Sequence, residues 1–94
     1  MSEIVVLKGK STTDCKKLCG SIVSVLSKET RCNIRTIGAG ALNQATKAII
    51  LAGQHFSAKG KTIKIQVCFE SVESDVAGAD SITSILQKLE LENI

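Results

Sequence analysis

TIGAGALNQATKAIILA, residues 36–52, passes from a β-branched run to an alanine-rich run across two glycines. This change predicts a strand, a turn through Gly38 and Gly40, and a helix that begins near Gly40 or Ala41. Glycine permits a positive φ and a close approach of the backbone, and the first N–H groups of a helix lack partners within it. The turn therefore either seats a phosphate or lets the strand and the helix pack closely, and the sequence leaves both open.

The two glycines do not form a nucleotide-binding motif. The spacing G-A-G-A-L-N lacks the third glycine of a dinucleotide fingerprint, and no G-K-[ST] follows, as a P-loop requires. We therefore expect no bound cofactor.

The helix after the turn is predicted to be amphipathic. One face carries Asn43, Lys47 and Gln54 together with Ile50, and it is either ordinary surface or part of a subunit contact. The inward face is apolar and mostly small, which lets the helix lie close to a sheet or to another helix: Leu42, Ala45, Ile49 and Ala52, with Ala41 and Ala48 beside them.

Short β-branched runs predict strands at residues 3–8 (EIVVLK) and 32–37 (CNIRTI). Between them, Thr12 or Thr13 is expected to cap a helix. The apolar positions of this helix are 15, 18, 19, 22, 23 and 26, the stripe of an amphipathic helix.

A third strand is predicted at residues 61–70 (KTIKIQVCFE), where apolar residues at 63, 65, 67 and 69 alternate with less apolar ones. The alternation predicts that the apolar face of this strand is buried. Residues 71–80 are expected to form a loop, and 81–92 (SITSILQKLELE) fit either a strand or a helix. The elements together predict an α/β fold in two layers, a mixed sheet with helices on one side.

Ninety-four residues, 44% of them apolar, predict one compact domain spanning 1–94. The longest apolar run, residues 48–52, is far shorter than the roughly 20 residues of a membrane span, and the start MSEIVVLKGK shows neither a secretory nor a myristoylation signal. We expect a cytoplasmic protein without a membrane partner. Four cysteines lie in apolar or helical patterns, which favours reduced, buried thiols: Cys15, Cys19, Cys32 and Cys68.

Charge is distributed unevenly along the chain. Residues 1–64 hold eleven Lys or Arg and three acids, a net charge of +8, whereas residues 65–94 hold one Lys and six acids, a net charge of −5. Such asymmetry favours a basic face that attracts a polyanion. A solvated surface on which the two halves neutralise each other is the alternative.

Residues 36–52, with the run G-A-G-A-L-N-Q-A, closely resemble the signature of the SpoVS family, the stage V sporulation protein S proteins. The order of elements agrees over most of the chain. The resemblance implies an Alba-like α/β domain of two layers in the order β-α-β-α-β-β, which makes the last element a strand. It also implies dimers or higher oligomers, a relation to the DNA- and RNA-binding Alba proteins, and regulation of sporulation.

In Alba-like domains, nucleic acid is met by basic residues after the first strand, by the turn before the second helix and by an arm between the last two strands. Here the arm segment SVESDVAGADS has three acids and no Lys or Arg, so it departs from a basic arm. The resemblance and the charge distribution together predict these nucleic-acid-binding residues: Lys8, Lys10, Lys16, Lys17, Arg35, Gly38, Gly40, Asn43, Gln44, Lys47, Lys59 and Lys61.

Base stacking is not expected to contribute much. Phe56 and Phe69 are the aromatic residues of the chain, and Phe69 lies on the apolar face of its strand. Binding should therefore be electrostatic, directed at phosphates and poorly sequence-specific, with Lys64 adding to the lysines named above.

We expect no enzymatic activity. The single histidine, His55, lies near the end of the second helix without an evident catalytic partner and is expected to complement the helix dipole. Cys15 and Cys19 lie four residues apart in an apolar stripe, where core packing is commoner than metal binding, so no metal site is expected. The alternative to nucleic-acid binding is a protein-interaction module whose glycine turn serves packing alone.

Overall fold

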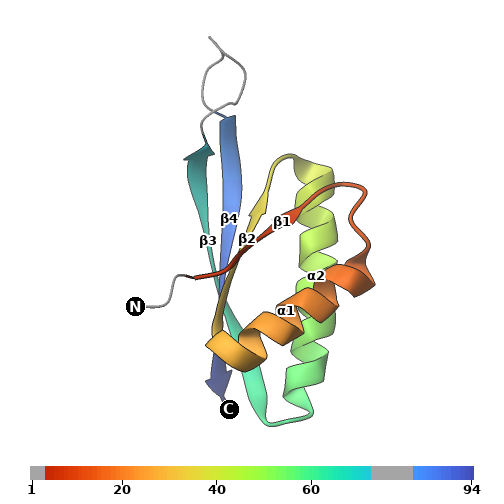
Figure 1. Ribbon diagram of the computed structural model, residues 1–94, viewed down its shortest axis with the longest axis vertical. Coiled ribbons are helices and arrows are strands. Elements are labelled where there is room, and N and C mark those ends of the chain that lie inside the picture. Colours follow the sequence, from red (N-terminus) through yellow and green to blue (C-terminus); the bar gives the residue numbers. More distant parts are fainter. Residues whose placement is uncertain (1–3, 73–81) are drawn as a thin grey trace.

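The computed structural model describes residues 4–72 and 82–94 (Figure 1). These residues form, in chain order, β1 (Val6–Gly9), α1 (Cys15–Glu29), β2 (Arg31–Thr36), α2 (Ala39–Ser57), β3 (Lys61–Val72) and β4 (Ile82–Asn93). The predicted order β-α-β-α-β-β is confirmed, and the ambiguous last segment is a strand. Most of the expected loop at 71–80 lies outside the described residues.

The strands form one mixed sheet in the order β1-β2-β4-β3, and both helices lie on the same face of it (Figure 1). β1 pairs with β2 in parallel, whereas β4 pairs antiparallel with both β2 and β3. β4 is thus hydrogen-bonded along both edges, which is why its residues form a strand although their periodicity also fits a helix. The predicted two-layer α/β architecture is confirmed.

The core lies between the helices and the sheet. Cys32 and Ile34 of β2 and Leu89 of β4 point toward the helices and are buried. The same core cluster includes, from the helices, Leu18, Ile22, Leu26, Ala45, Ala48, Ile49, Ala52 and Phe56. The predicted inward faces of both helices face the core, although Cys15, Cys19, Val23 and Leu42 are only half-buried.

The cap of α1 differs from the prediction. Asp14, not Thr12 or Thr13, is the N-cap, and its carboxylate accepts hydrogen bonds from the backbone N–H groups of Lys16 and Lys17. The hydroxyl of Thr13 instead accepts from the backbone N–H of Lys10 at 2.8 Å. Thr13 therefore closes the loop before the helix, which leaves the next residue to cap it.

The prediction that the apolar face of β3 is buried is wrong for most of the strand. Ile63 is half-buried, but Ile65, Val67 and Phe69 are 49%, 60% and 78% exposed. β3 is an edge strand, and α2 borders its first residues, where Ile63 and Ile49 line one shallow hollow. The residues farther along the strand extend past this cover.

The prediction of buried thiols is also only partly correct. All four cysteines are free, but only Cys32 is buried, and Cys15, Cys19 and Cys68 are partly exposed. Burial raises the pKa of the Cys32 thiol to about 11 and raises the pKa of Cys19 as well. Among the described residues no helix is both long and apolar enough to cross a bilayer.

Candidate functional site

The carboxyl ends of the parallel strands β1 and β2 bring cations together. Lys8 pairs in register with Arg35, so both side chains project from the sheet face that the helices leave open. A hollow of about 340 Å³ lies at this end of the strands. We call its lining residues the basic edge: Lys8, Gly9, Lys10, Ser11, Arg35 and Ile37.

The three cations of the basic edge are not equally available. Arg35 donates through Nε to the Glu70 carboxylate of β3 at 2.6 Å, in a partly exposed ion pair. Lys8 and Lys10 are exposed and form no salt bridge within the described residues. The two lysines therefore supply the free positive charge of this edge.

The glycines of the opening turn have two different roles. Gly38 is the N-cap of α2 with φ +89°, a conformation that favours glycine. Gly40 lies in the first turn of α2, where an added Cβ would come within 2.9 Å of the Cβ of Ser11. The turn therefore allows α2 to pack against the loop that follows β1, and this close packing explains Gly40 without a ligand.

The start of α2 nevertheless borders the basic edge. Gly38 provides no side-chain cap, so the first N–H groups of α2 receive no side-chain acceptor from it. Gly40 touches Ser11, a lining residue of the basic edge. The positive end of the α2 dipole thus adds to the charge of the neighbouring lysines.

Three predicted residues continue along α2. Asn43 and Lys47 are exposed. Gln44 is half-buried, and its amide donates to the Thr13 carbonyl oxygen at 2.8 Å, tying α2 to the loop before α1. Lys47 donates to the Gln44 amide oxygen at 3.3 Å. The Gln44 side chain thus connects α2 to the loop before α1, whereas Asn43 and Lys47 face solvent.

Lys16 and Lys17 lie in the first turn of α1, and both are exposed. Their helix start abuts α2, since the thiol of Cys15 approaches the carbonyl oxygen of Gln44 at 3.8 Å. These two lysines therefore lie at the end of α1 that contacts α2 near Gln44.

Lys59 and Lys61 are separated from the other predicted residues. They flank Gly60 in the turn between α2 and β3, at the opposite end of α2 from Gly38. The 19 residues of α2 span about 28 Å, so one small contact cannot include both ends of the helix. The structure thus divides the predicted set into a group around the basic edge and the starts of the helices, and a distant pair.

Two residues that lie near the predicted nucleic-acid-binding residues were not identified from the sequence. Glu70 pairs with Arg35 from 35 positions away, and no local pattern signals such a contact. Ser11 lines the basic edge beside Lys10, and only its place in the turn after the first strand could have pointed to it.

Neither the histidine nor any possible metal ligand lines the basic edge. No group of three or more His, Cys, Asp or Glu side chains among the described residues is placed to hold a metal ion. His55 lies exposed in the last turn of α2 and packs edge-on against Phe56, with ring centroids 5.2 Å apart. The lysines of the basic edge and the start of α2 together form a positively charged region that can attract anions.

Residues 5–90 match the family model of stage V sporulation protein S (SpoVS). The chain belongs to the SpoVS family. This SpoVS-family match covers both helices and the glycine turn, so it confirms the resemblance that residues 36–52 indicated.

The SpoVS-family chain also resembles a solved structure, Alba from Thermoplasma volcanium. The TM-score is 0.59 at 13% sequence identity, and the match covers 90% of this chain and 98% of that chain. Since the identity is low, this likeness concerns the fold, and it confirms the Alba-like architecture.

Proposed function

We propose that this SpoVS-family protein is a small, non-enzymatic regulator that binds nucleic acid without sequence specificity, through phosphates at the basic edge. One observation carries the proposal: Lys8 and Lys10 are exposed and without a salt-bridge partner in the described part of the chain, beside the uncapped start of α2. Family membership and the Alba-like fold support it by analogy. Its role concerns sporulation or developmental gene regulation in the cytoplasm, where free thiols stay reduced.

The charge pattern supports phosphate contacts over base recognition. Lys16 and Lys17 add exposed positive charge at the start of α1, and Lys47 adds an exposed charge near the middle of α2. Phe56 is buried in the core, and the basic edge contains no aromatic side chain. Stacking on bases is therefore not available there, and affinity depends on counterion release.

We further propose that the protein acts as a homodimer or higher oligomer through the uncovered apolar side of α2 and β3. Four exposed side chains define this apolar surface: Ile50, Ile65, Val67 and Phe69. It includes a 12-residue edge strand whose outer backbone groups have no strand partner within the sheet. Such an edge with apolar side chains is prone to association, and pairing with a second copy would cover it.

The test of nucleic-acid binding is fluorescence anisotropy with labelled duplex DNA, single-stranded DNA and RNA at two salt concentrations. The variant Lys8→Gln/Lys10→Gln is compared with Lys59→Gln/Lys61→Gln, which has the same net charge but alters the distant pair. We expect the first variant to lose most of its affinity and to reduce the slope of log K against log salt by about 0.9 per lost phosphate contact on duplex DNA. The second should bind almost as well as the unmodified protein.

Equal losses in the two variants would show that net charge alone attracts the nucleic acid and that the basic edge is not the contact. Absence of binding to all three nucleic acids at low salt would instead favour a protein-interaction module. The exposed apolar surface on α2 and β3 is the observation that favours this second function.

A further inference from the structure

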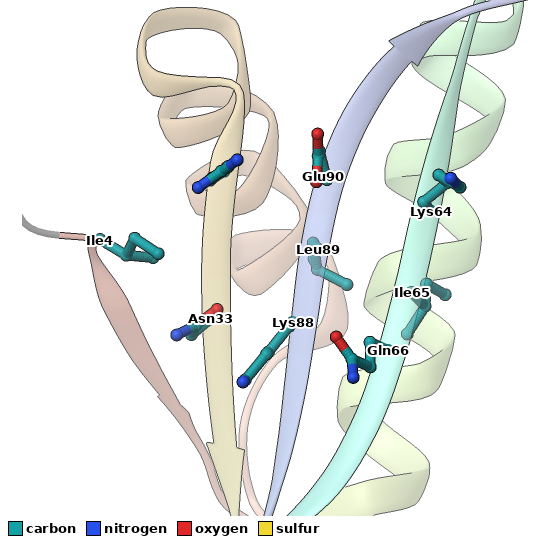
Figure 2. A pocket seen from close by; sticks show the side chains of 9 residues that line it. Ile4, Asn33, Lys64, Ile65, Gln66, Lys88, Leu89 and Glu90 are labelled. Atoms are coloured by element: carbon teal, nitrogen blue, oxygen red, sulfur yellow. The ribbon is translucent and has the colours of Figure 1, made fainter.

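A second hollow lies on the open face of the sheet, and it shares no lining residue with the basic edge. Its volume is about 510 Å³, within the range of small-molecule sites. Residues of β2, β4 and β3 form its floor, and Ile4 lies at one side (Figure 2). We call it the open-face hollow, and its polar lining residues are Arg31, Asn33, Lys64, Gln66, Lys88 and Glu90.

The strand register orders these side chains into two rows. In one row Lys88 of β4 lies between Asn33 of β2 and Gln66 of β3, so an ammonium group is flanked by two amides (Figure 2). In the other row Glu90 of β4 lies between Arg31 of β2 and Lys64 of β3. The hollow thus combines three cations, two amides and a single carboxylate.

Two of the three cations are free to meet a ligand. Lys64 donates to the Glu92 carboxylate at 3.2 Å. Arg31 and Lys88 have no salt-bridge partner in the described parts of the chain, and both are exposed. On this face Arg35 and Lys64 are thus paired with acids, whereas Arg31 and Lys88 are not.

The chemistry of the lining selects a class of ligand. None of its side chains is aromatic, so neither a nucleobase nor another flat ring finds a stacking partner. Arg31 and Lys88 lie diagonally on neighbouring strands, a separation of roughly 5–8 Å between Cβ atoms. That spacing suits oxygens on two anionic groups of one molecule, and the guanidinium of Arg31 can bind one of these groups in a bidentate manner.

We propose that the open-face hollow binds a small polyanion, a molecule with two or more phosphate or carboxylate groups, between Arg31 and Lys88. Asn33 and Gln66 supply amide N–H groups to the same oxygens from either side of Lys88. Glu90 limits the negative charge that the hollow accepts. This site is independent of nucleic-acid binding at the basic edge.

The experiment is a titration of the ¹⁵N-labelled protein with pyrophosphate and, separately, with citrate, followed by amide chemical shifts. The two probes distinguish a phosphate ligand from a carboxylate ligand. We expect saturable shifts centred on residues 31–33, 64–66 and 88–90 with at least one of them. Arg31→Gln/Lys88→Gln should weaken binding at least about tenfold, because charge-assisted hydrogen bonds are lost.

Two further variants make the test selective. Lys8→Gln/Lys10→Gln removes the same charge from the basic edge and should leave the affinity for the probes within about twofold, because neither lysine lines the hollow and salt weakens their longer-range attraction. Glu90→Gln should tighten binding several-fold, because it removes a carboxylate from between two cations. A purely structural role of Glu90 would not produce tighter binding.

The proposal is overturned if neither probe gives saturable shifts, or if the shifts centre on residues 8–11 and disappear in the Lys8→Gln/Lys10→Gln variant. The second outcome would assign the anion to the basic edge. Loss of nucleic-acid binding in that variant, with unchanged shifts at residues 31–33, would support two separate sites.

Discussion

Arg35 on β2 and Glu70 on β3 form an ion pair of 2.6 Å across the strand between them, β4. The pair lies on the open face, and both side chains are partly exposed, 26% and 32%. The contact joins the sequence's basic half to its acidic half in space. The Arg35 charge at the basic edge is therefore already partly neutralised by the protein itself.

Replacing Glu70 with Gln should strengthen nucleic-acid binding. The change frees Arg35 to contact a phosphate, so duplex affinity should rise several-fold and the salt slope should steepen by about 0.9. The stability cost should be small, about 0.2–1 kcal/mol, as for other solvent-accessible pairs. Anisotropy titrations at two salt concentrations measure the effect.

The matched control for this prediction is Glu92→Gln, which removes the same charge from the Lys64 pair on the same sheet. If Glu70→Gln and Glu92→Gln raised the affinity equally, the gain would come from net charge or from the freed Lys64, and Arg35 would have no special role.

Replacing Gly40 with Ala should destabilise the protein by about 1–3 kcal/mol, the usual cost of overpacking. The added Cβ would lie 2.9 Å from the Cβ of Ser11, so α2 or the loop after β1 must shift. Urea unfolding measures the change. Gly53→Ala is the control in the same helix, because its Cβ would meet no atom within 4 Å, and it should stabilise by about 0.5–1 kcal/mol.

Adding Ser11→Gly to Gly40→Ala removes one of the two clashing atoms and should recover most of the lost stability. If Gly40→Ala were as stable as Gly53→Ala, close packing would not explain the second glycine of the turn.

Much of the fold was predictable because each local pattern agrees with its final environment. The helical stripe of α1 contains Leu18, Ile22 and Leu26, all buried, and the glycines at 38 and 40 lie where strand gives way to helix. The last segment was not predictable from periodicity. This segment forms the strand β4 because it hydrogen-bonds to β2 along one edge and to β3 along the other. Pairing with distant strands cannot be recognised from the local sequence pattern.

The candidate site was predictable in type but not in detail. Lys8 ends a predicted strand and Lys10 follows it, so their place at its carboxyl end could be inferred. The predicted helix already placed Lys59 beyond its far end, but the sequence did not indicate that Glu70 would form an ion pair with Arg35. That ion pair depends on the strand order, which is a tertiary property.

The exposed side of β3 gives a prediction about assembly. Ile65→Lys/Phe69→Lys should shift the protein to monomers, because burying two unpaired ammonium groups in a contact is costly, and the dissociation constant should rise at least about a hundredfold. Sedimentation velocity measures the change. Ile94→Lys, at a side chain that is 82% exposed, is the control and should leave the assembly intact.

A sedimentation coefficient that is unchanged in Ile65→Lys/Phe69→Lys would place the subunit contact elsewhere on the molecule. A monomeric unmodified protein at tens of micromolar concentration would contradict the proposed oligomer itself.

Cys32 should make stability fall with rising pH in the alkaline range. Its folded pKa is about 11, above the ordinary value of 9.0, because burial disfavours the thiolate. Below pH 9 the thiol is protonated in both states, so its full contribution is present. Between pH 9 and 11 only the unfolded state loses the proton, so the free energy of unfolding falls by up to about 3 kcal/mol.

Urea unfolding from pH 7 to 11 should show this loss in the unmodified protein. The variant Cys32→Ala is expected to be less stable at pH 7 because of the cavity it leaves, and its stability should change less with pH. Since lysines and the other cysteines titrate in both proteins, parallel profiles would mean that Cys32 does not carry the pH dependence.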